Sequence, residues 1–482
     1  MSLEKGAMIM ATGKLTQMMF VSNTAVAGGG GRCIFGATLF VDNGAAFTMS
    51  QNTADQGGGM ELADGGASVT VRGTTSSMYV WNNSSGKYDG GGGLLLWPGA
   101  AAIITAPSVF SGNRADNGAG GAIAFAGSPS FTGTSACVPL ELEIKGSKAS
   151  ATGTNGKTHL QVYTLPMSPL DSRTGDWDRL VTNSPSKWCV PCGRYTLYVG
   201  TFIRTLSLGP GAYIRVHLGR LSGRGSSILA EDLFTLAQNS TSLLISIPCS
   251  EQGVRLSQAR FESNVAAFGG AIGVARLRTT NSFFNVSKST FVGNSAKNKG
   301  GAVHLSGEQS GAQFIDGCVF RSNWASGSNL VDGPGGGGAI SVEDGSEVRI
   351  ENAEAISNSV LGEASGGFLS ASFAGPILLN RVNVRDSHTE PLGGGGGLFV
   401  VATRVILFQV NIEGCSAGDG GGGGMLVTAR SSVKLLSGTN MSNNTISMTN
   451  GYNRVGFGGH IRVSESRVEI DGNKSRHEMQ AS

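Results

Sequence analysis

The sequence predicts an all-β fold, a right-handed parallel β-helix (a solenoid of stacked coils) that is interrupted by one β-rich insert. Three observations predict it. A Gly-Gly pair recurs eleven times, a Phe-x-x-Asn motif precedes most of these pairs, and short runs with alternating apolar residues follow them. The composition agrees, since 76 of the 482 residues are Gly and only 14% are charged, against about 25% in ordinary globular domains.

The Gly-Gly pairs set the period of the repeat. Neighbouring pairs lie 27 to 37 residues apart, except for one gap of 149 residues. We expect the pairs at the corners of coils, because glycine adopts positive φ without steric cost. Numbered by their last glycine, the pairs are Gly31, Gly59, Gly93, Gly121, Gly270, Gly301, Gly338, Gly367, Gly397, Gly424 and Gly459.

The Phe-x-x-Asn motif is the second mark. We expect the Phe residues to stack from coil to coil, and the Asn residues to adopt left-handed turn conformations and to bond one another along the solenoid. The clear copies are Phe20 with Asn23, Phe110 with Asn113 and Gly120-Gly121, Phe261 with Asn264 and Gly269-Gly270, Phe291 with Asn294 and Gly300-Gly301, and Phe320 with Asn323 and Gly337-Gly338. Weaker copies are Met49 with Asn52, Tyr79 with Asn82, Ala355 with Asn358, Met441 with Asn444, and Ile412 with Cys415 in place of Asn.

The residues after each glycine pair alternate in hydrophobicity with a period of two. Ile123 and Phe125 follow one pair in this way, and Ile272 and Val274 follow the next. Such alternation predicts a strand with one buried face. A repeat of about 30 residues with several short strands cannot bury its apolar face alone, so the coils must stack.

The marks divide the chain into three predicted regions. Residues 1–127 and 256–482 carry the repeats, and residues 128–255 lack both marks. Alternating runs such as Leu140–Ile144 and Tyr195–Val199 predict strands in this middle region. Two interpretations remain open for it, a compact sandwich-like insert or degenerate coils. We favour the insert, because the repeat period vanishes on both sides at once.

Charge and hydropathy exclude several classes. A net charge of +3 and the lack of a basic block give no case for nucleic-acid binding. We expect no membrane-spanning helix, because the apolar segment Leu94–Phe110 contains two prolines and Phe399–Phe408 is short and contains Arg404. No signal peptide is visible in the first fifteen residues, so a fragment of a longer chain is one reading.

The paired marks resemble those of the polymorphic outer-membrane proteins, autotransporter-type surface proteins whose passengers repeat Gly-Gly-Ala-Ile and Phe-x-x-Asn. The matching segments are Gly120–Ile123, Gly269–Ile272, Gly300–Val303 and Gly337–Ile340. The resemblance covers about 1–126 and 256–482. It implies a cell-surface or extracellular protein linked to adhesion, with a host or neighbouring cell-surface protein or glycan as partner. The middle interruption departs from the family pattern, and similar repeats occur in extracellular proteins of protists.

A carbohydrate-active enzyme, pectate-lyase-like or a glycoside hydrolase, is the alternative function, because parallel β-helices also carry such enzymes. A glycosidase needs two carboxylates that face the scissile bond. The densest acidic group in the repeats is Asp316, Asp332, Glu343, Asp344 and Glu347. Asp is a common turn former, so we expect solvated turns here and no catalytic residue.

No cofactor or metal site is predicted. His304 should point outward if Val303 and Leu305 point inward, and His460 lies several coils away, too far to share a metal. Cys189 and Cys192 form a Cys-x-x-Cys motif in the middle region. The motif is compatible with a disulfide, either local or paired with other cysteines, and it is loosely similar to a motif of small extracellular cysteine-rich modules. A zinc site needs four ligands, and the sequence has no second Cys-x-x-Cys motif to complete one.

Seven Asn-x-Ser/Thr sequons occur, and these would carry glycans if a eukaryotic host secretes the chain. They lie at Asn82, Asn83, Asn239, Asn285, Asn440, Asn443 and Asn473. The function that the sequence predicts is therefore that of a non-enzymatic extracellular or cell-surface repeat protein for adhesion or surface display.

Overall fold

The computed structural model confirms an all-β chain with a parallel β-solenoid. The structure describes residues 2–3, 7–34, 37–63, 67–86, 90–97, 100–125, 254–274, 282–307, 311–327, 336–390, 392–446 and 458–470, and between 126 and 253 only the backbone of the strands. These parts contain no helix. The chain forms two compact units, Met1–Ser128 with Gly253–Ser482 and, separately, Pro129–Gln252.

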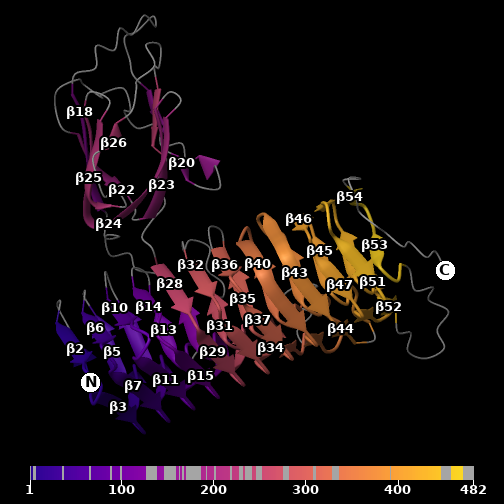
Figure 1. Ribbon diagram of the computed structural model, residues 1–482, viewed down its shortest axis with the longest axis horizontal. Coiled ribbons are helices and arrows are strands. Elements are labelled where there is room, and N and C mark those ends of the chain that lie inside the picture. Colours follow the sequence, from indigo (N-terminus) through magenta and orange to yellow (C-terminus); the bar gives the residue numbers. More distant parts are fainter. Residues whose placement is uncertain are drawn as a thin grey trace, which may run out of the picture. The chain divides into compact units, whose positions relative to one another are not determined.

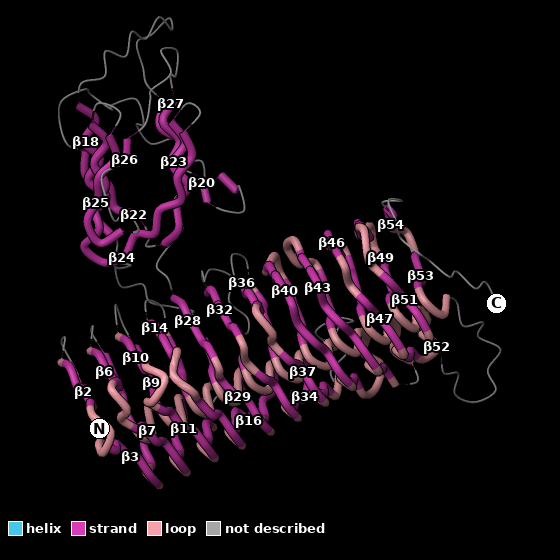
Figure 2. Tube along the Cα trace, in the orientation of Figure 1, coloured by secondary structure: helices cyan, strands magenta, loops and turns pink. Residues whose placement is uncertain are grey.

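The solenoid unit is built from three parallel sheets, called here A, B and C (Figures 1 and 2). Sheet A follows the glycine pairs, and its twelve described strands are β1 (Ser2–Leu3), β5 (Gly31–Ile34), β9 (Met60–Ala63), β13 (Leu94–Leu96), β17 (Ile123–Phe125), β31 (Ile272–Val274), β35 (Val303–Ser306), β39 (Ile340–Glu343), β42 (Leu369–Ser372), β45 (Leu398–Val401), β49 (Met425–Thr428) and β53 (Ile461–Val463).

Sheet B comprises two adjoining ladders, because each coil crosses it in two steps. The first ladder is β2 (Met8–Thr12), β6 (Thr38–Asp42), β10 (Ser68–Val71), β14 (Ala101–Ile104), β28 (Gln252–Ser257), β32 (Ser282–Ser287), β36 (Gly311–Ile315), β40 (Glu347–Ile356), β43 (Ile377–Arg385), β46 (Arg404–Phe408), β50 (Ser432–Leu435) and β54 (Arg467–Ile470). The second is β3 (Gln17–Val21), β7 (Ala46–Ser50), β11 (Ser77–Trp81), β15 (Ser108–Ser111), β29 (Ala259–Glu262), β33 (Thr290–Val292), β37 (Val319–Arg321), β47 (Asn411–Glu413) and β51 (Asn440–Ser442), with β40 and β43 long enough to span both.

Sheet C completes each coil. They are β4 (Thr24–Ala27), β8 (Thr53–Gln56), β12 (Ser84–Ser85), β16 (Arg114–Ala119), β30 (Val265–Phe268), β34 (Ser295–Lys299), β38 (Trp324–Ala325), β41 (Ser359–Val360), β44 (His388–Thr389), β48 (Ser416–Ala417) and β52 (Thr445–Ile446). A coil therefore runs through both ladders of sheet B, then sheet C, then sheet A.

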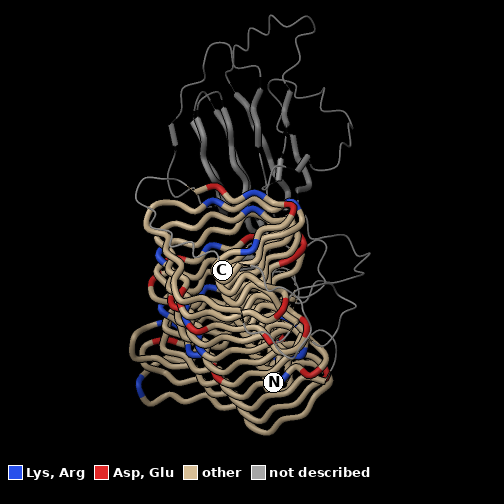
Figure 3. The backbone as a smooth tube through the Cα atoms, turned by 90° about the vertical axis from the view of Figure 1, so that its right-hand side faces the viewer, with Lys and Arg blue, Asp and Glu red and all other residues tan. Residues whose placement is uncertain are grey.

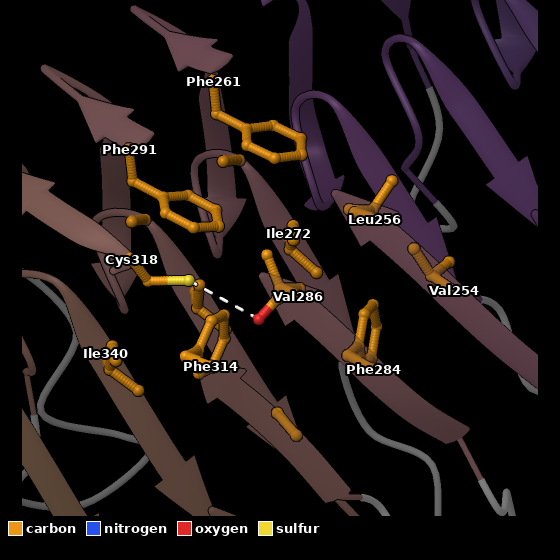
Figure 4. Close-up of a cluster of buried hydrophobic side chains, with 14 of the residues drawn as sticks. Val254, Leu256, Phe261, Ile272, Phe284, Val286, Phe291, Phe314, Cys318 and Ile340 are labelled. Atoms are coloured by element: carbon orange, nitrogen blue, oxygen red, sulfur yellow. Dashed lines mark hydrogen bonds between the residues drawn. The ribbon is translucent and has the colours of Figure 1, made fainter. Parts of the chain in front are cut away.

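The core lies inside the coils, where inward side chains stack on their equivalents in neighbouring coils. The rings of Phe110, Phe261, Phe291 and Phe320 are nearly parallel, with centroids 5.0, 4.7 and 4.8 Å apart in that order. Figure 4 shows Phe261 and Phe291 stacked in this way among other buried side chains. The stack follows from the strand pairing, which sets equivalent residues of successive coils side by side.

The coil register continues across the middle region. β15 pairs with β29 so that Phe110 lies beside Phe261, and β17 pairs with β31 so that Ile123 lies beside Ile272. The 129–252 unit thus occupies the connection from sheet A to sheet B within one coil. Degenerate coils would add strands to the three solenoid sheets, and none of the described strands of this unit joins them.

The insert has its own sheets. Eight strands form a sheet with both antiparallel and parallel pairs, and two short strands form a hairpin. The larger sheet holds β18 (Val138–Lys145), β19 (His159–Gln161), β22 (Ser186–Val190), β23 (Gly193–Val199), β24 (Phe202–His217), β25 (Arg220–Ser226), β26 (Asp232–Leu233) and β27 (Ser242–Ile245), and the hairpin is β20 (Tyr163–Thr164) with β21 (Ser168–Pro169).

Candidate functional site

Asn residues form one column at the turn from sheet B to sheet C, and the column is buried from Asn52 onward. The backbone N and Nδ2 of Asn113 both donate to Oδ1 of Asn264, at 3.1 and 3.0 Å, and Nδ2 also donates to the carbonyl of Val80 at 2.9 Å. Bonds of this kind join Asn23, Asn52, Asn83, Asn113, Asn264, Asn294, Asn323 and Asn358 in succession. The column satisfies buried turn groups that would otherwise be unpaired.

The column is interrupted near the C-terminus. Ser387 and then Cys415 take the place of Asn, as the pairing of the strands that follow them shows. The Ser387 hydroxyl donates to the Arg385 carbonyl at 3.3 Å. The column resumes at Asn444, whose Oδ1 accepts from the backbone N of Cys415 at 2.9 Å.

One predicted role of these Asn residues is wrong. None of the column residues has positive φ; the residue directly before each one does, with φ of 52° to 63°. The turn needs left-handed backbone there, while the Asn side chain must point into the column. These residues are Ser22, Gln51, Asn82, Gly112, Ser263, Gly293, Ser322, Ser357, Asp386, Gly414 and Asn443.

The predicted copy Tyr79 with Asn82 is displaced by one residue. Val80 pairs with Phe110, and Asn83 occupies the column, while Tyr79 and Asn82 face outward and are exposed. The motif begins with an aromatic residue in its clear copies, which Tyr79 matches better than Val80 does, so the sequence alone favours the wrong register.

The two glycines of each pair are required for different reasons. The first has φ of 59° to 82°, at Gly28, Gly57, Gly91, Gly120, Gly269, Gly300, Gly337, Gly366, Gly395, Gly422 and Gly458. The second lies against the next coil: a Cβ on Gly121 would lie 2.4 Å from the Gly270 carbonyl oxygen, and one on Gly301 would lie 2.1 Å from that of Gly338. In the longer glycine runs the second position is Gly29, Gly58, Gly92, Gly396 and Gly423, so numbering by the last glycine is off by one or two residues.

A group of polar side chains on the outer face of sheet A is the strongest candidate for a functional site. In β35, β39 and β42 the inward residues are apolar and every outward residue is polar. Most of the outward side chains are nonetheless buried. With Lys299 they are called here the outer polar cluster, which comprises Lys299, His304, Ser306, Ser341, Glu343, Ser370 and Ser372.

The charged members of the outer polar cluster are paired. Lys299 Nζ lies 2.8 Å from Glu343 Oε1, and these side chains are only 5% and 14% exposed. At its margin Ser306 Oγ donates to Asp344 Oδ2 at 2.7 Å. Removal of either partner would leave a largely buried charge without compensation, which is costly in free energy.

His304 is neutral in the outer polar cluster. Burial, together with the nearby charge of Lys299, lowers its pKa to about 3. Its Nδ1 and the hydroxyls of Ser341 and Ser370 have no hydrogen-bond partner. His304 and Ser341 therefore form no nucleophile–base pair, although strand pairing makes them neighbours. The described arrangement offers a polar lining and no activated nucleophile.

The predicted acidic group does not come together as one set. Asp316 and Asp344 are exposed turn residues with positive φ, as expected for solvated turns. Glu343 differs, because it is bound to Lys299 in the outer polar cluster. Glu347 begins β40, where burial raises the pKa of its carboxyl. Asp332 lies outside the described residues.

The remaining candidate residues are dispersed. His460 lies near Asn444, with 3.4 Å between its Nδ1 and the amide nitrogen. Cys33, Cys318 and Cys415 are free and buried, and burial raises their pKa values to about 11, 11 and 12; Figure 4 shows the Cys318 thiol, which donates to the Val286 carbonyl at 3.5 Å. Cys189 and Cys192 lie outside the residues whose side chains are described.

Charge and metal-binding groups are likewise spread out in the described part. Figure 3 shows Lys and Arg interspersed with Asp and Glu around the coils. The described residues contain no group of three His, Cys, Asp or Glu side chains placed to share a metal ion. Among them there is also no helix with the length and hydropathy to cross a membrane.

A scan of protein-family models finds no match to this chain, and a search of curated proteins finds no similar sequence.

Proposed function

We propose that this chain is a non-enzymatic extracellular or cell-surface repeat protein whose solenoid is a scaffold for display and adhesion. One observation carries the proposal: the solenoid continues in register across the 129–252 unit. Asn113 bonds directly to Asn264, and Phe110 stacks on Phe261, although the insert separates them in sequence. One connection of the coil therefore accommodates the 129–252 unit, and the strand pairing between the neighbouring coils is kept.

A scaffold of this kind suits display. Its strands and glycine corners are fixed by contacts between coils, while its connections vary in length and carry the residues that face a partner. The repeat marks resemble those of the polymorphic outer-membrane proteins, and this resemblance supports a surface role. The partner in the proposal is a host or neighbouring cell-surface protein or glycan.

The paired state of the outer polar cluster also favours this proposal over a carbohydrate-active enzyme. A glycosidase needs one free carboxylate and one protonated one on either side of the substrate. Glu343 is bound to Lys299, and Asp344 accepts a hydrogen bond from Ser306. Neither carboxyl is held as a free pair in a cleft of the described residues.

The test compares the full chain with a variant in which a short Gly-Ser linker replaces residues 129–252. Both are coupled to beads and offered to cultured cells and to a glycan array. We expect the full chain to bind and the variant to keep its β-sheet spectrum while losing at least tenfold in bound beads. Binding by neither protein would overturn the proposal. So would turnover of a polysaccharide by the full chain that Glu343→Gln abolishes.

A further inference from the structure

Two successive asparagines at the end of β11 both lie in glycosylation sequons. Asn82-Asn83-Ser84 and Asn83-Ser84-Ser85 overlap, so the sequence offers two acceptors at one turn. The structure separates them completely, because Asn82 is exposed and Asn83 is fully buried.

Both amide hydrogens of Asn83 are used in hydrogen bonds inside the column. Its Nδ2 donates to Asn113 Oδ1 at 3.0 Å and to the Met49 carbonyl at 3.1 Å. Its Oδ1 accepts from both the backbone N and Nδ2 of Asn52, at 3.1 and 2.9 Å. A sugar on Nδ2 would replace one of the donated hydrogens and would need space inside the column. Folding of this coil and modification of Asn83 are therefore incompatible.

Asn82 has the opposite environment. It occupies the left-handed position of the turn, with φ of 53°, and its exposed side chain lies against the next coil. The residue that it covers there is Gly112, where a Cβ would lie 2.3 Å from Asn82 Oδ1. The absence of a side chain at Gly112 leaves room for the amide at the surface.

Exposed aromatic residues of β11 lie just before Asn82. Tyr79 and Trp81 are 44% and 39% exposed on the outer face of sheet B. In the neighbouring coils the position of Trp81 is taken by Ser50 and Ser111. Tyr79 and Trp81 thus add aromatic surface beside Asn82 that the neighbouring coils lack at the position of Trp81, and the C–H faces of sugar rings pack well on aromatic rings. A glycan on Asn82 would lie against this aromatic surface.

We propose that Asn82 is an N-glycan acceptor and that Asn83 stays unmodified in the folded chain; this rests on the proposed extracellular role. In the transfer, Asn82 Nδ2 bonds to the anomeric carbon of a lipid-pyrophosphate-linked oligosaccharide. One Nδ2–H bond breaks and releases its proton. The bond from the anomeric carbon to the pyrophosphate oxygen breaks, and the lipid pyrophosphate leaves with the electron pair.

Asn443 is the equivalent acceptor in a later coil. It holds the same left-handed turn position, with φ of 54°, is exposed, and begins the sequon Asn443-Asn444-Thr445. Its buried neighbour Asn444 is followed by Thr445 and Ile446 and has no sequon. Asn443 therefore reports on the same geometry without a competing acceptor at the next residue, and mass spectrometry distinguishes it from the exposed sequon at Asn440.

Ser84 and Ser85 allow the two sequons to be removed one at a time. Ser84→Ala abolishes the Asn82 sequon and keeps that of Asn83, and Ser85→Ala does the reverse. Ser85 is buried, its hydroxyl has no hydrogen-bond partner, and Ala54 and Ala115 take its place in the neighbouring coils. Ser85→Ala should therefore preserve the fold, because it removes an unpaired buried hydroxyl.

The experiment expresses the full chain behind a secretion leader in yeast or cultured animal cells and maps glycan occupancy by enzymatic deglycosylation in heavy-oxygen water and mass spectrometry. We expect occupied Asn82 and Asn443 and empty Asn83 in the secreted wild-type protein and in Ser85→Ala. Secreted Ser84→Ala should lose all glycan at this turn, and any Asn83 occupancy should be confined to the retained, misfolded fraction.

Two results would overturn the assignment. One is empty Asn82 in both the secreted and the retained fractions of Ser85→Ala. The other is secreted Ser84→Ala with occupied Asn83 and an unchanged unfolding temperature. The bead assay described above can be run on unglycosylated protein expressed in bacteria and is then independent of this mapping, so a failure of the display proposal and a failure of the glycan assignment can be told apart.

Discussion

The coils before and after Val360 use the same turn in different ways. In the earlier coils an unbroken column of eight Asn residues lines the turn, and four Phe rings stack beneath it. In the later coils Ser387 and Cys415 interrupt the column, and the stacked position holds Val384 and then Ile412. Sheets A, B and C nevertheless continue without a break.

The difference teaches that strand pairing alone is enough to propagate the coil. The Asn column and the Phe stack add stability and fix the turn where they are present. At the boundary, β40 and β43 run through both ladders of sheet B as single strands, whereas the coil of Cys415 again has two separate strands, β46 and β47. Substitutions in the two regions should therefore have unequal effects.

The largest expected effect is that of Phe291→Ala in the earlier coils. Phe291 is fully buried and lies between two parallel rings, so its loss should cost about 4 kcal/mol in the free energy of unfolding. Val384→Ala, at the equivalent position of a later coil, should cost about 2 kcal/mol because fewer buried carbons are lost. Guanidinium unfolding followed by circular dichroism measures both. Equal losses would contradict the contrast between the regions.

The next effect is that of Asn294→Ala. The substitution leaves the backbone N and Nδ2 of Asn264 without their acceptor and removes the donor to the Phe261 carbonyl. We expect a loss of about 3 kcal/mol, since buried groups left unpaired cost about 1–3 kcal/mol each. Ser387→Ala is the matched control and should cost less than about 1 kcal/mol. A comparable loss in the control would show that the amide column has no special role.

Repair of the column should have a smaller and opposite effect. Ser387→Asn together with Cys415→Asn would join Asn358 to Asn444 through continuous side-chain bonds. We expect a gain of about 1 kcal/mol for the double variant, and less than half of it for either single change, because only the double variant forms the bond between the two introduced amides. A double-mutant cycle on unfolding free energies tests this. Strict additivity would mean that the introduced amides do not bond to each other.

The sequence predicts the coil itself well, because both marks follow from the backbone geometry of the corners. The exact register is harder to obtain. In a run such as Gly90–Gly93 several alignments look alike, and the pairing of Leu94 with Met60 decides between them. Likewise, only the pairing of Val80 with Phe110 shows that Asn83, and not Asn82, belongs to the column.

The outer polar cluster could be predicted only in part. Alternation around Val303 and Leu305 correctly predicts that His304 points outward. It does not show that His304 is buried there, because the burial depends on neighbouring chain segments and not on its own strand. The partnership of Glu343 with Lys299 joins two different coils, and no pattern within one repeat specifies it.

The last comparison concerns the left-handed residue of the turn, where the two regions again differ and the expected difference between them is small. A Cβ on Gly293 would meet only Ser263 Oγ, at 3.8 Å, whereas one on Gly414 would lie 2.7 Å from Asp386 Oδ1. Gly293→Ala should therefore cost only the backbone strain of positive φ, about 1 kcal/mol. Gly414→Ala should cost somewhat more, because the Asp386 side chain must also move.

The reverse substitution completes this comparison. Ser263→Gly relieves the strain at φ of 53°, but it also gives the unfolded chain more freedom, so we expect a change within about 0.5 kcal/mol. Thermal unfolding of the three variants ranks them. If Gly293→Ala destabilises the protein as much as Gly414→Ala does, the neighbouring side chain is not what distinguishes the later coils at this turn.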